Sequence, residues 1–365
     1  MATVINIDDL ALAPQEVQSL AEAIFEKKIE KGNLTTMHSV ITGIQHGKKI
    51  PFVGQLGLVG ECISGCDAPD GASLAMSEKT WEPKTIGFRL EHCSKDLNSL
   101  VTYLKKKVQR YPDEYDITGS AEQTVVQMRA EDATEDMLWR FLHFGDKTIA
   151  NVADDGYLKD GVNVKYFNCI NGLWTKVFAE ANLSSGGKYY VNIAKNGEAS
   201  YTAQDALATD YTKGLIKDMI KKADARLKSA PNKVFLATDS LIENLLTSFE
   251  EVSWKNAMDV KADLARLTAT YGRTAYIATY RGVDIYRVVN WDETIRTYFD
   301  NGTKWNLPHR ALLTTPDNIP IGTPSTEMLG SLDSFYDRKD KKNYVDAEIV
   351  VDIQLLEDYM AVAAY

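Results

Sequence analysis

Cysteine is scarce in this chain, with four residues in 365: Cys62, Cys66, Cys93 and Cys169. So few thiols argue against a disulfide scaffold and indicate a reducing compartment. Long apolar runs are also absent. The longest covers residues 359–365, whereas a membrane-spanning helix needs about 20 apolar residues. No basic segment followed by an apolar one opens the chain, so we expect a soluble, non-secreted product with no membrane partner.

The chain has fewer basic than acidic residues: 41 Lys and Arg against 51 Asp and Glu, which gives a formal charge of −10. Such an acidic chain does not fit a protein whose whole surface binds phosphates. Hydrophobic residues make up 44% and charged residues 25%, which permits a large core and excludes global disorder. At about 150 residues per domain, the length predicts about two domains.

Motifs for catalysis are missing as well. Gly186-Gly187-Lys188 lacks the upstream glycine of a phosphate-binding loop, and Tyr189 stands where a Ser or Thr would follow. No Gly-x-Ser-x-Gly or His-Glu-x-x-His pattern occurs. The five histidines have no carboxylate or nucleophile at a telling spacing, and His143, beside the apolar face of a helix, favours a packing role. We therefore expect no catalytic residues and no enzymatic activity.

One grouping resembles a metal site: Cys62 and Cys66 together with His92 and Cys93. Thiolates and an imidazole suit zinc, but the spacing departs from the usual zinc knuckle, and adjacent residues on a strand cannot easily point the same way. Small buried thiols are the ordinary alternative. We expect no metal and no cofactor.

Hydrophobic periodicity predicts helices and strands along most of the chain. Expected helices cover residues 14–31, the stretch from a Ser94 cap to Pro112, residues 121–144 with Gly145 as the stop, 203–227, and the segment after Asp239. Expected strands cover residues 81–90, 234–237, 275–279, 283–290, 294–299 and an alternating C-terminal strand over 345–355 with one wet and one dry face. The segment from Gly161 onward therefore reads as α/β.

Residues 41–80 form a different kind of segment, with seven of the chain's 23 glycines. Its short apolar pieces have neither helical periodicity nor enough contiguous apolar surface to fold alone. One interpretation is a glycine-rich β-meander at a domain edge. The other is an extended arm, in the form of a two-stranded ribbon, that lies on a neighbouring molecule.

A charged run occupies residues 337–342, with four basic residues and two acidic ones. A solvated turn between strands is the simpler interpretation. The alternative is a basic turn that faces nucleic acid, formed by Arg338, Lys339, Lys341 and Lys342.

The order of these elements resembles the major capsid protein of tailed bacteriophages, the Hong Kong 97-type family. Three stretches carry the resemblance besides the glycine-rich segment and the helix that ends at Gly145: Asn171–Trp174, Tyr280–Ile285 and Arg310–Thr323. The resemblance implies an α+β fold with the following parts: an N-terminal arm and helix (1–40), an extended E-loop (41–90), a spine helix and the start of a P-domain (91–160), an α/β A-domain (161–305), and a return to the P-domain with C-terminal strands (306–365).

The same resemblance implies a function. The chain is expected to self-assemble into pentamers and hexamers of an icosahedral virion shell around double-stranded DNA, assembled in the cytoplasm of a bacterial host. Scaffolding, portal and decoration proteins are candidate partners, and contact with packaged DNA is expected to be weak and non-specific. E-loop residues expected to contact a neighbouring subunit are Pro51, Phe52, Leu56, Leu58 and Trp81. Two alternatives stay open: an encapsulin-type compartment shell, and an α/β enzyme or solute-binding protein.

Overall fold

The computed structural model describes residues 37–47, 49–53, 76–93, 121–252, 274–324, 333–337 and 342–365. Its strands are β1 (Val40–Thr42), β2 (Lys49–Val53), β3 (Met76–Thr80), β4 (Lys84–Cys93), β5 (Tyr190–Val191), β6 (Lys233–Ala237), β7 (Thr274–Tyr280), β8 (Val283–Val288), β9 (Ala311–Thr314), β10 (Ile321–Thr323), β11 (Asp333–Asp337), β12 (Lys342–Ile353) and β13 (Val362–Ala364). Its α-helices are α4 (Ala121–Phe144), α5 (Leu173–Ala179), α6 (Tyr201–Asp205), α7 (Tyr211–Lys222), α8 (Ala225–Ser229), α9 (Asp239–Val252) and α11 (Val289–Tyr298), and single-turn 3-10 helices include η3 (Val164–Tyr166) and η5 (Pro316–Asn318).

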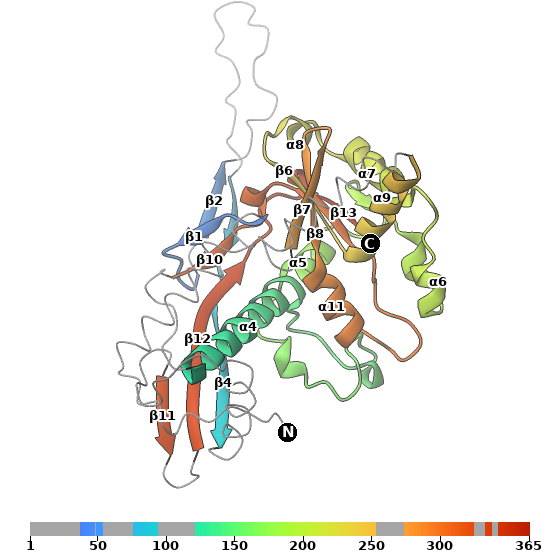
Figure 1. Ribbon diagram of the computed structural model, residues 1–365. Helices are drawn as coiled ribbons and strands as arrows, with labels where there is room; N and C mark the ends of the chain where they lie inside the picture. Colours follow the sequence, from blue (N-terminus) through green and yellow to red (C-terminus); the bar gives the residue numbers. More distant parts are fainter. Residues whose placement is uncertain are drawn as a thin grey trace, which may run out of the picture.

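The long helix α4 has the bounds that the sequence predicts, and it runs diagonally across the middle of the molecule (Figure 1). The last turns of α4 carry the buried side chains Leu138, Phe141 and Leu142. Gly145 follows the last residue of the helix. A Cβ at this position would lie 2.5 Å from the carbonyl oxygen of Ile170. Only glycine allows the chain to pass so close to this neighbouring backbone. The expected helices over 14–31 and after Ser94 lie outside the described residues.

A mixed sheet, with strand order β1-β10-β12-β11 and with β4 also paired to β12, lies beside α4 (Figure 1). The predicted C-terminal strand is confirmed as β12, which pairs with β4 from Lys342 to Val351. Its predicted dry face is buried, at residues 347, 349, 351 and 353. The predicted solvent-exposed face is confirmed only in part, because Asp352 and Gln354 are also buried. At its end, β12 is covered on both sides.

The predicted two-stranded ribbon is confirmed for its described part, because β2 and β3 pair with each other in antiparallel register from Lys49↔Thr80 to Val53↔Met76. A hydrogen bond from the amide of Gly47 to the carbonyl of Trp81, 3.0 Å long, closes its base. In Figure 1 the ribbon stands on the opposite side of the molecule from α6, α7 and α9. The strand expected over 81–90 begins at Lys84.

A six-stranded sheet forms the α/β lobe, with strand order β5-β13-β9-β6-β8-β7. The predicted strand over 234–237 is confirmed as β6, which is buried and pairs in parallel with β8 and antiparallel with β9. The strands β9 and β13 belong to the segment expected to return to the P-domain, yet they lie in this sheet. Figure 1 shows α7 and α9 packed side by side against this lobe.

Two predicted elements of this lobe are wrong. The helix expected over 203–227 is three helices, because Asp210 adopts a left-handed conformation (φ 60°) and the Asp224 side chain caps a new helix by accepting from the amide of Arg226. The strand expected over 294–299 is the second half of α11. Its β-branched and aromatic residues favour a strand locally, but Trp291 and Ile295 are fully buried at helical spacing, so tertiary packing overrides this preference.

Candidate functional site

The base of the ribbon is held to the body by polar contacts with the ends of α5 and β12. Lys79 of β3 forms an ion pair of 2.5 Å with Glu180, which follows α5. The Gln354 side chain donates to the carbonyl of Thr80 over 2.9 Å, and the amide of Glu82 donates to Oδ2 of Asp352 over 2.8 Å. The burial of Asp352 is thus explained: its carboxylate accepts hydrogen bonds where the ribbon leaves the sheet.

A cavity of about 250 Å³ lies among these groups. Lys176 of α5 borders it, with Nζ 3.5 Å from Oδ1 of Asp352. Burial lowers the pKa of Lys176, and the facing carboxylate of Asp352 opposes this change. Lys147 also borders the cavity and pairs with Glu82 at 2.6 Å. Each of the three lysines that line the cavity has a carboxylate partner, so the cavity is not an anion site.

Of the ribbon residues predicted to contact a neighbouring subunit, the structure describes only some. Pro51 and Phe52 lie on β2, opposite Glu78 and Ser77 of β3. Leu56 and Leu58 lie outside the described residues.

The assignment of Trp81 to the contact with a neighbouring subunit needs correction. Its side chain is 1% exposed in the single chain. A Cβ added at Gly322 would lie 2.7 Å from Cζ3 of Trp81 and 2.7 Å from Cδ1 of Ile44, so the indole packs against β10 and the segment after β1. Trp81 therefore anchors the ribbon from within and has no apolar surface left for a neighbour.

The residues of the metal-like grouping are not brought together in the described part. Cys62 and Cys66 lie outside it, while His92 and Cys93 are the last two residues of β4. Across the described ranges, no three His, Cys, Asp or Glu side chains are placed to hold a metal ion. Cys169 has a free thiol, and burial raises its pKa, which makes it a poor nucleophile.

The strands β11 and β12 flank the basic run. Asp337, the last residue of β11, is the pairing partner of Lys342, the first residue of β12. Arg338, Lys339 and Lys341 lie outside the described residues.

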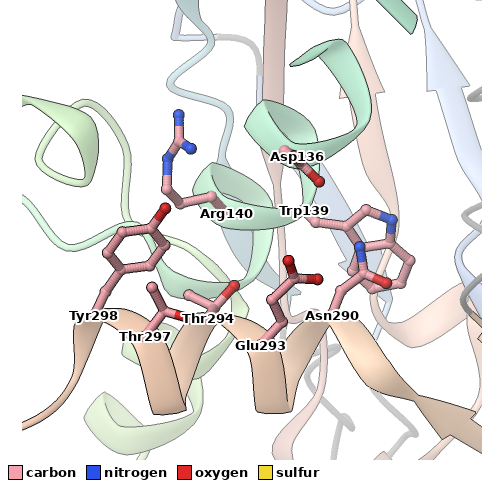
Figure 2. A pocket seen from close by; sticks show the side chains of 8 residues that line it. All are labelled: Asp136, Trp139, Arg140, Asn290, Glu293, Thr294, Thr297 and Tyr298. Carbon is pink, nitrogen blue, oxygen red and sulfur yellow. The ribbon is translucent and has the colours of Figure 1, made fainter. Parts of the chain in front are cut away.

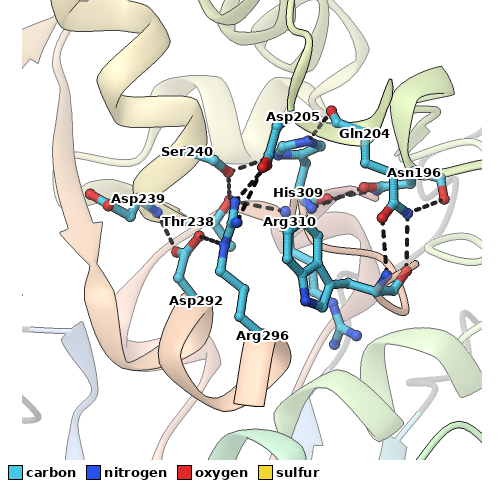
Figure 3. A network of polar contacts seen from close by, with 11 residues as sticks. Asn196, Gln204, Asp205, Thr238, Asp239, Ser240, Asp292, Arg296, His309 and Arg310 are labelled. Atoms are coloured by element: carbon cyan, nitrogen blue, oxygen red, sulfur yellow. Dashed lines mark hydrogen bonds and ion pairs between the residues drawn. The ribbon is translucent and has the colours of Figure 1, made fainter. Parts of the chain in front are cut away.

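A polar network inside the α/β lobe was missed by sequence reasoning (Figure 3). The Oγ of Ser240 lies 2.7 Å from Nδ1 of His309, and Nε2 of His309 lies 2.8 Å from the carbonyl oxygen of Gln204. Because the carbonyl only accepts, Nε2 carries the proton and Nδ1 accepts from the Ser240 hydroxyl. Ser240 and His309 are 69 residues apart in the chain, so no short motif marks them.

This serine–histidine pair resembles a nucleophile with its base, but the geometry favours a structural role. His309 is fully buried, and burial lowers its pKa. Asn196 holds its backbone on both sides, by accepting from the amide and donating to the carbonyl over 2.9 and 2.7 Å. Neither Ser240 nor His309 borders the cavity at the ribbon base or the groove described next. The pair ties the segment just before β9 to α6 and α9.

Next to it, Asp292 of α11 caps another helix. Its carboxylate accepts from the amide of Asp239 at the start of α9, and Arg296 lies 3.7 Å away (Figure 3). Burial raises the pKa of Asp292 to about 7, although the hydrogen bond from Asp239 opposes the change. A raised pKa is common at catalytic carboxylates. Here the hydrogen bond to a helix start accounts for the position of the carboxylate.

A shallow groove of about 100 Å³ lies between α4 and α11 (Figure 2). Polar side chains of both helices line it, namely Asp136, Arg140, Asn290, Glu293, Thr294, Thr297 and Tyr298, with Trp139 at one end. The Nε of Arg140 donates to the carbonyl of Tyr166 over 3.0 Å, so this guanidinium already has a partner in its own chain. The groove combines both charge signs and has no nucleophile beside a base.

The fold and these sites together define a class: an α+β body in which a β-ribbon, anchored by polar contacts and one buried indole, leaves the edge of a mixed sheet. No helix among the described residues is long and apolar enough to span a bilayer. No protein-family model matches the chain, and no curated protein matches it.

Solved structures do match the chain over most of its length. A structure from Mycobacterium phage Ogopogo is 10% identical, covers 91% of this chain and 91% of its own, and has a TM-score of 0.50. The satellite phage P4 procapsid with its size determination (Sid) protein is 14% identical, with coverages of 95% and 98% and a TM-score of 0.49. The capsid of a native GTA particle is 14% identical, with coverages of 100% and 94% and a TM-score of 0.48. The chain has the Hong Kong 97-type fold, and the Ogopogo match carries this assignment.

Proposed function

We propose that this chain is the major capsid protein of a tailed bacteriophage and assembles with copies of itself into the icosahedral shell around the genome. The observation that carries the proposal is the ribbon β2–β3, which leaves the edge of a body with the Hong Kong 97-type fold. In a shell, the ribbon of one subunit lies on its neighbour.

The energetic argument concerns the apolar residues of the ribbon. An isolated two-stranded hairpin is at best marginally stable in water. If Pro51, Phe52, Leu56 and Leu58 become buried on a neighbour, each full side chain contributes about 1.5–3 kcal/mol. Modest contacts repeated around closed rings of subunits then stabilise a shell.

The anchoring of the ribbon base supports this role. Trp81 and the polar contacts around Asp352 attach the base to the body, and these are contacts that the subunit makes alone. A fixed base sets the direction in which the ribbon leaves the body, so that binding to a neighbour costs less conformational entropy than it would for a free arm.

The finer assignments belong to the same proposal. The segments 1–40, 41–90, 91–160, 161–305 and 306–365 act as N-terminal arm, E-loop, spine region, A-domain and C-terminal return, and the subunits form pentamers and hexamers. The basic turn at residues 338–342 makes weak, non-specific contact with DNA, because four basic residues stand out in an otherwise acidic chain. Scaffolding, portal and decoration proteins complete the set of partners, and the host cytoplasm is the place of assembly.

Electron microscopy of the purified chain tests the proposal. We expect closed shells or rings of subunits for the natural chain. A variant in which a short Gly-Ser linker replaces residues 49–79 should keep the circular dichroism spectrum of the folded body and should form no shells. An unfolded product, or shells that form without the ribbon, would contradict the role of the ribbon.

A matched pair of point variants makes the test sharper. Phe52 and Ser77 are pairing partners on the two strands of the ribbon. Phe52→Ser removes a large apolar side chain and should raise the subunit concentration needed for assembly by about tenfold or more, which corresponds to the lower end of the burial energy of one side chain. Ser77→Ala, at the paired position, should assemble like the natural chain. Equal assembly of both variants would show that the ribbon's apolar side chains stay in water.

A further inference from the structure

Two fully buried histidines meet between the segment before β1 and the last turn of α4. His38 precedes β1 and is 1% exposed, and His143 lies in the last turn of α4 with no exposed surface. Their Nε2 atoms are 3.1 Å apart. Nδ1 of His38 lies 2.8 Å from the carbonyl oxygen of Ile319, just before β10. The pair therefore connects three segments that are far apart in sequence.

Hydrogen-bond chemistry fixes the protons of this contact. The carbonyl of Ile319 only accepts, so His38 carries its proton on Nδ1, and its Nε2 is the acceptor when the ring is neutral. His143 then donates from Nε2, and its Nδ1, 3.3 Å from the carbonyl oxygen of Trp139, carries no proton in the neutral pair. The hydrogen bond between the rings has room for one proton between the two Nε2 atoms. When both Nε2 atoms carry a proton, the hydrogen bond is lost, because two N–H groups and two positive charges then face each other over 3.1 Å.

The surroundings of the pair are apolar and aromatic. The ring of His143 stacks on Trp139 with centroids 4.6 Å apart and contacts the edge of Trp291 of α11 at 5.7 Å. Met37, the neighbour of His38, is fully buried. Water and counter-ions therefore have little access to a charge on either ring.

Charged groups on the adjoining helices do not offset such a charge. Asp136 and Arg140 of α4 and Glu293 of α11 line the groove that Trp139 also borders, and none of them contributes to the pKa shift of either ring. The pKa of His143 lies well below its usual value because of burial first and the facing His38 second, while the Trp139 carbonyl opposes the change. Burial likewise lowers the pKa of His38 to about 4, against a smaller opposing effect of the Ile319 carbonyl.

We propose that the His38–His143 contact is an acid-released latch, which holds residues 37–44 on the body while both rings are neutral and lets this segment detach when they become protonated. The segment is otherwise held by short pairings: β1 pairs with β10 over three residues, and the amide of Ser39 donates to the Pro316 carbonyl over 3.1 Å. Amides of Ile321, Gly43 and Ile44 add hydrogen bonds to the carbonyls of Ser39, Pro324 and Thr323, and Met37 and Ile44 are fully buried. Loss of the latch therefore weakens the attachment of the segment, and detachment also breaks these contacts.

The sign of the effect follows from the two states of each ring. A histidine in water titrates near pH 6.5, so the detached segment binds protons more readily than the attached one, and detachment becomes easier as the pH falls below about 6.5. For His38, with a pKa of about 4 when attached, lowering the pH from about 7.5 to about 5 raises the equilibrium constant for detachment by roughly 30-fold. His143 acts in the same direction, because burial and the facing His38 lower its pKa as well.

Amide hydrogen exchange on the purified full-length chain tests the latch, and the test does not depend on shell assembly. We expect the protection factors of residues 39–44, corrected for the intrinsic pH dependence of exchange, to fall by more than about 30-fold between pH 7.5 and 5. Protection in the buried strand β6 should persist, which excludes global unfolding. A change of less than about threefold in residues 39–44 would overturn the proposal.

Variants assign the effect to the two rings. His143→Gln keeps a donor toward Nε2 of His38 but does not titrate, so the fall in protection should shrink to roughly 30-fold. His46→Gln, at an exposed histidine in the same part of the chain, should behave like the natural chain. If His143→Gln unfolds, as loss of β6 protection would show, His38→Asn serves in its place, because its amide can still donate to the Ile319 carbonyl. An undiminished pH response in the folded variant refutes the latch.

Discussion

Replacement of Trp81 by alanine tests most directly where the ribbon is anchored. The indole is 1% exposed in the single chain, and loss of a large aromatic side chain from a core costs about 3–5 kcal/mol. We therefore expect Trp81→Ala to lower the free energy of unfolding of the dispersed subunit by this amount, measured by urea unfolding followed by far-ultraviolet circular dichroism.

The neighbouring glycine supplies an internal check on this magnitude. A Cβ at Gly322 would lie 2.7 Å from Cζ3 and 2.8 Å from Cη2 of Trp81, closer than normal van der Waals contact. Overpacking of this kind costs about 1–3 kcal/mol. In the Trp81→Ala background these ring atoms are gone and only the movable end of Ile44 remains, so Gly322→Ala should become nearly neutral. We expect a coupling free energy of about 1–3 kcal/mol between the two substitutions.

Two results would refute this reasoning. A loss below about 1 kcal/mol for Trp81→Ala in the dispersed subunit would mean that the indole is exposed in solution and becomes buried only in the assembled state. Additive effects of the two substitutions would mean that Trp81 and Gly322 are not in contact. Either result would return Trp81 to the set of residues expected to contact a neighbouring subunit.

Two further predictions concern charged groups. Asp292 has a pKa raised to about 7 in the folded chain, so the native state holds this proton more tightly than the unfolded state, and its contribution to stability should fall as the pH rises from about 4 to about 7. Asp292→Asn, which still accepts from the amide of Asp239, should lack this pH dependence. Urea unfolding at several pH values measures the difference, and parallel curves for the two proteins would count against a buried, titrating Asp292. Replacement of Arg338, Lys339, Lys341 and Lys342 by glutamine should reduce the slope of log K against log salt for DNA binding by up to about four if all four contact phosphates. An unchanged slope in a filter-binding assay would remove the basic turn from the DNA-contacting surface.

Local sequence patterns were sufficient for the long helix, the buried strand β6 and the alternating strand β12. The second half of α4 has helical spacing with Gly145 after it, β6 is a short apolar run, and β12 alternates with Val350 as the one exception. The two-stranded ribbon was one of two interpretations of the glycine-rich segment, and the pairing of β2 with β3 favours it over the β-meander.

Local patterns failed where packing or one backbone conformation overrides them. The β-branched residues of 294–299 favour a strand, but burial of Trp291 and Ile295 on one helical face makes this segment a helix. The broken helix over 201–229 depends on the left-handed conformation of Asp210, which propensity does not report.

The same distinction between local pattern and tertiary packing applies to the residues of the candidate sites. The sequence by itself was enough to predict a large core, an acidic net charge and a paired ribbon in the glycine-rich segment, because composition and periodicity are properties of neighbouring residues. Only the tertiary structure decided that Trp81 faces its own subunit and that His38 meets His143 across 105 residues of chain. Contacts between residues so far apart depend on how the elements pack, and no local pattern records that geometry.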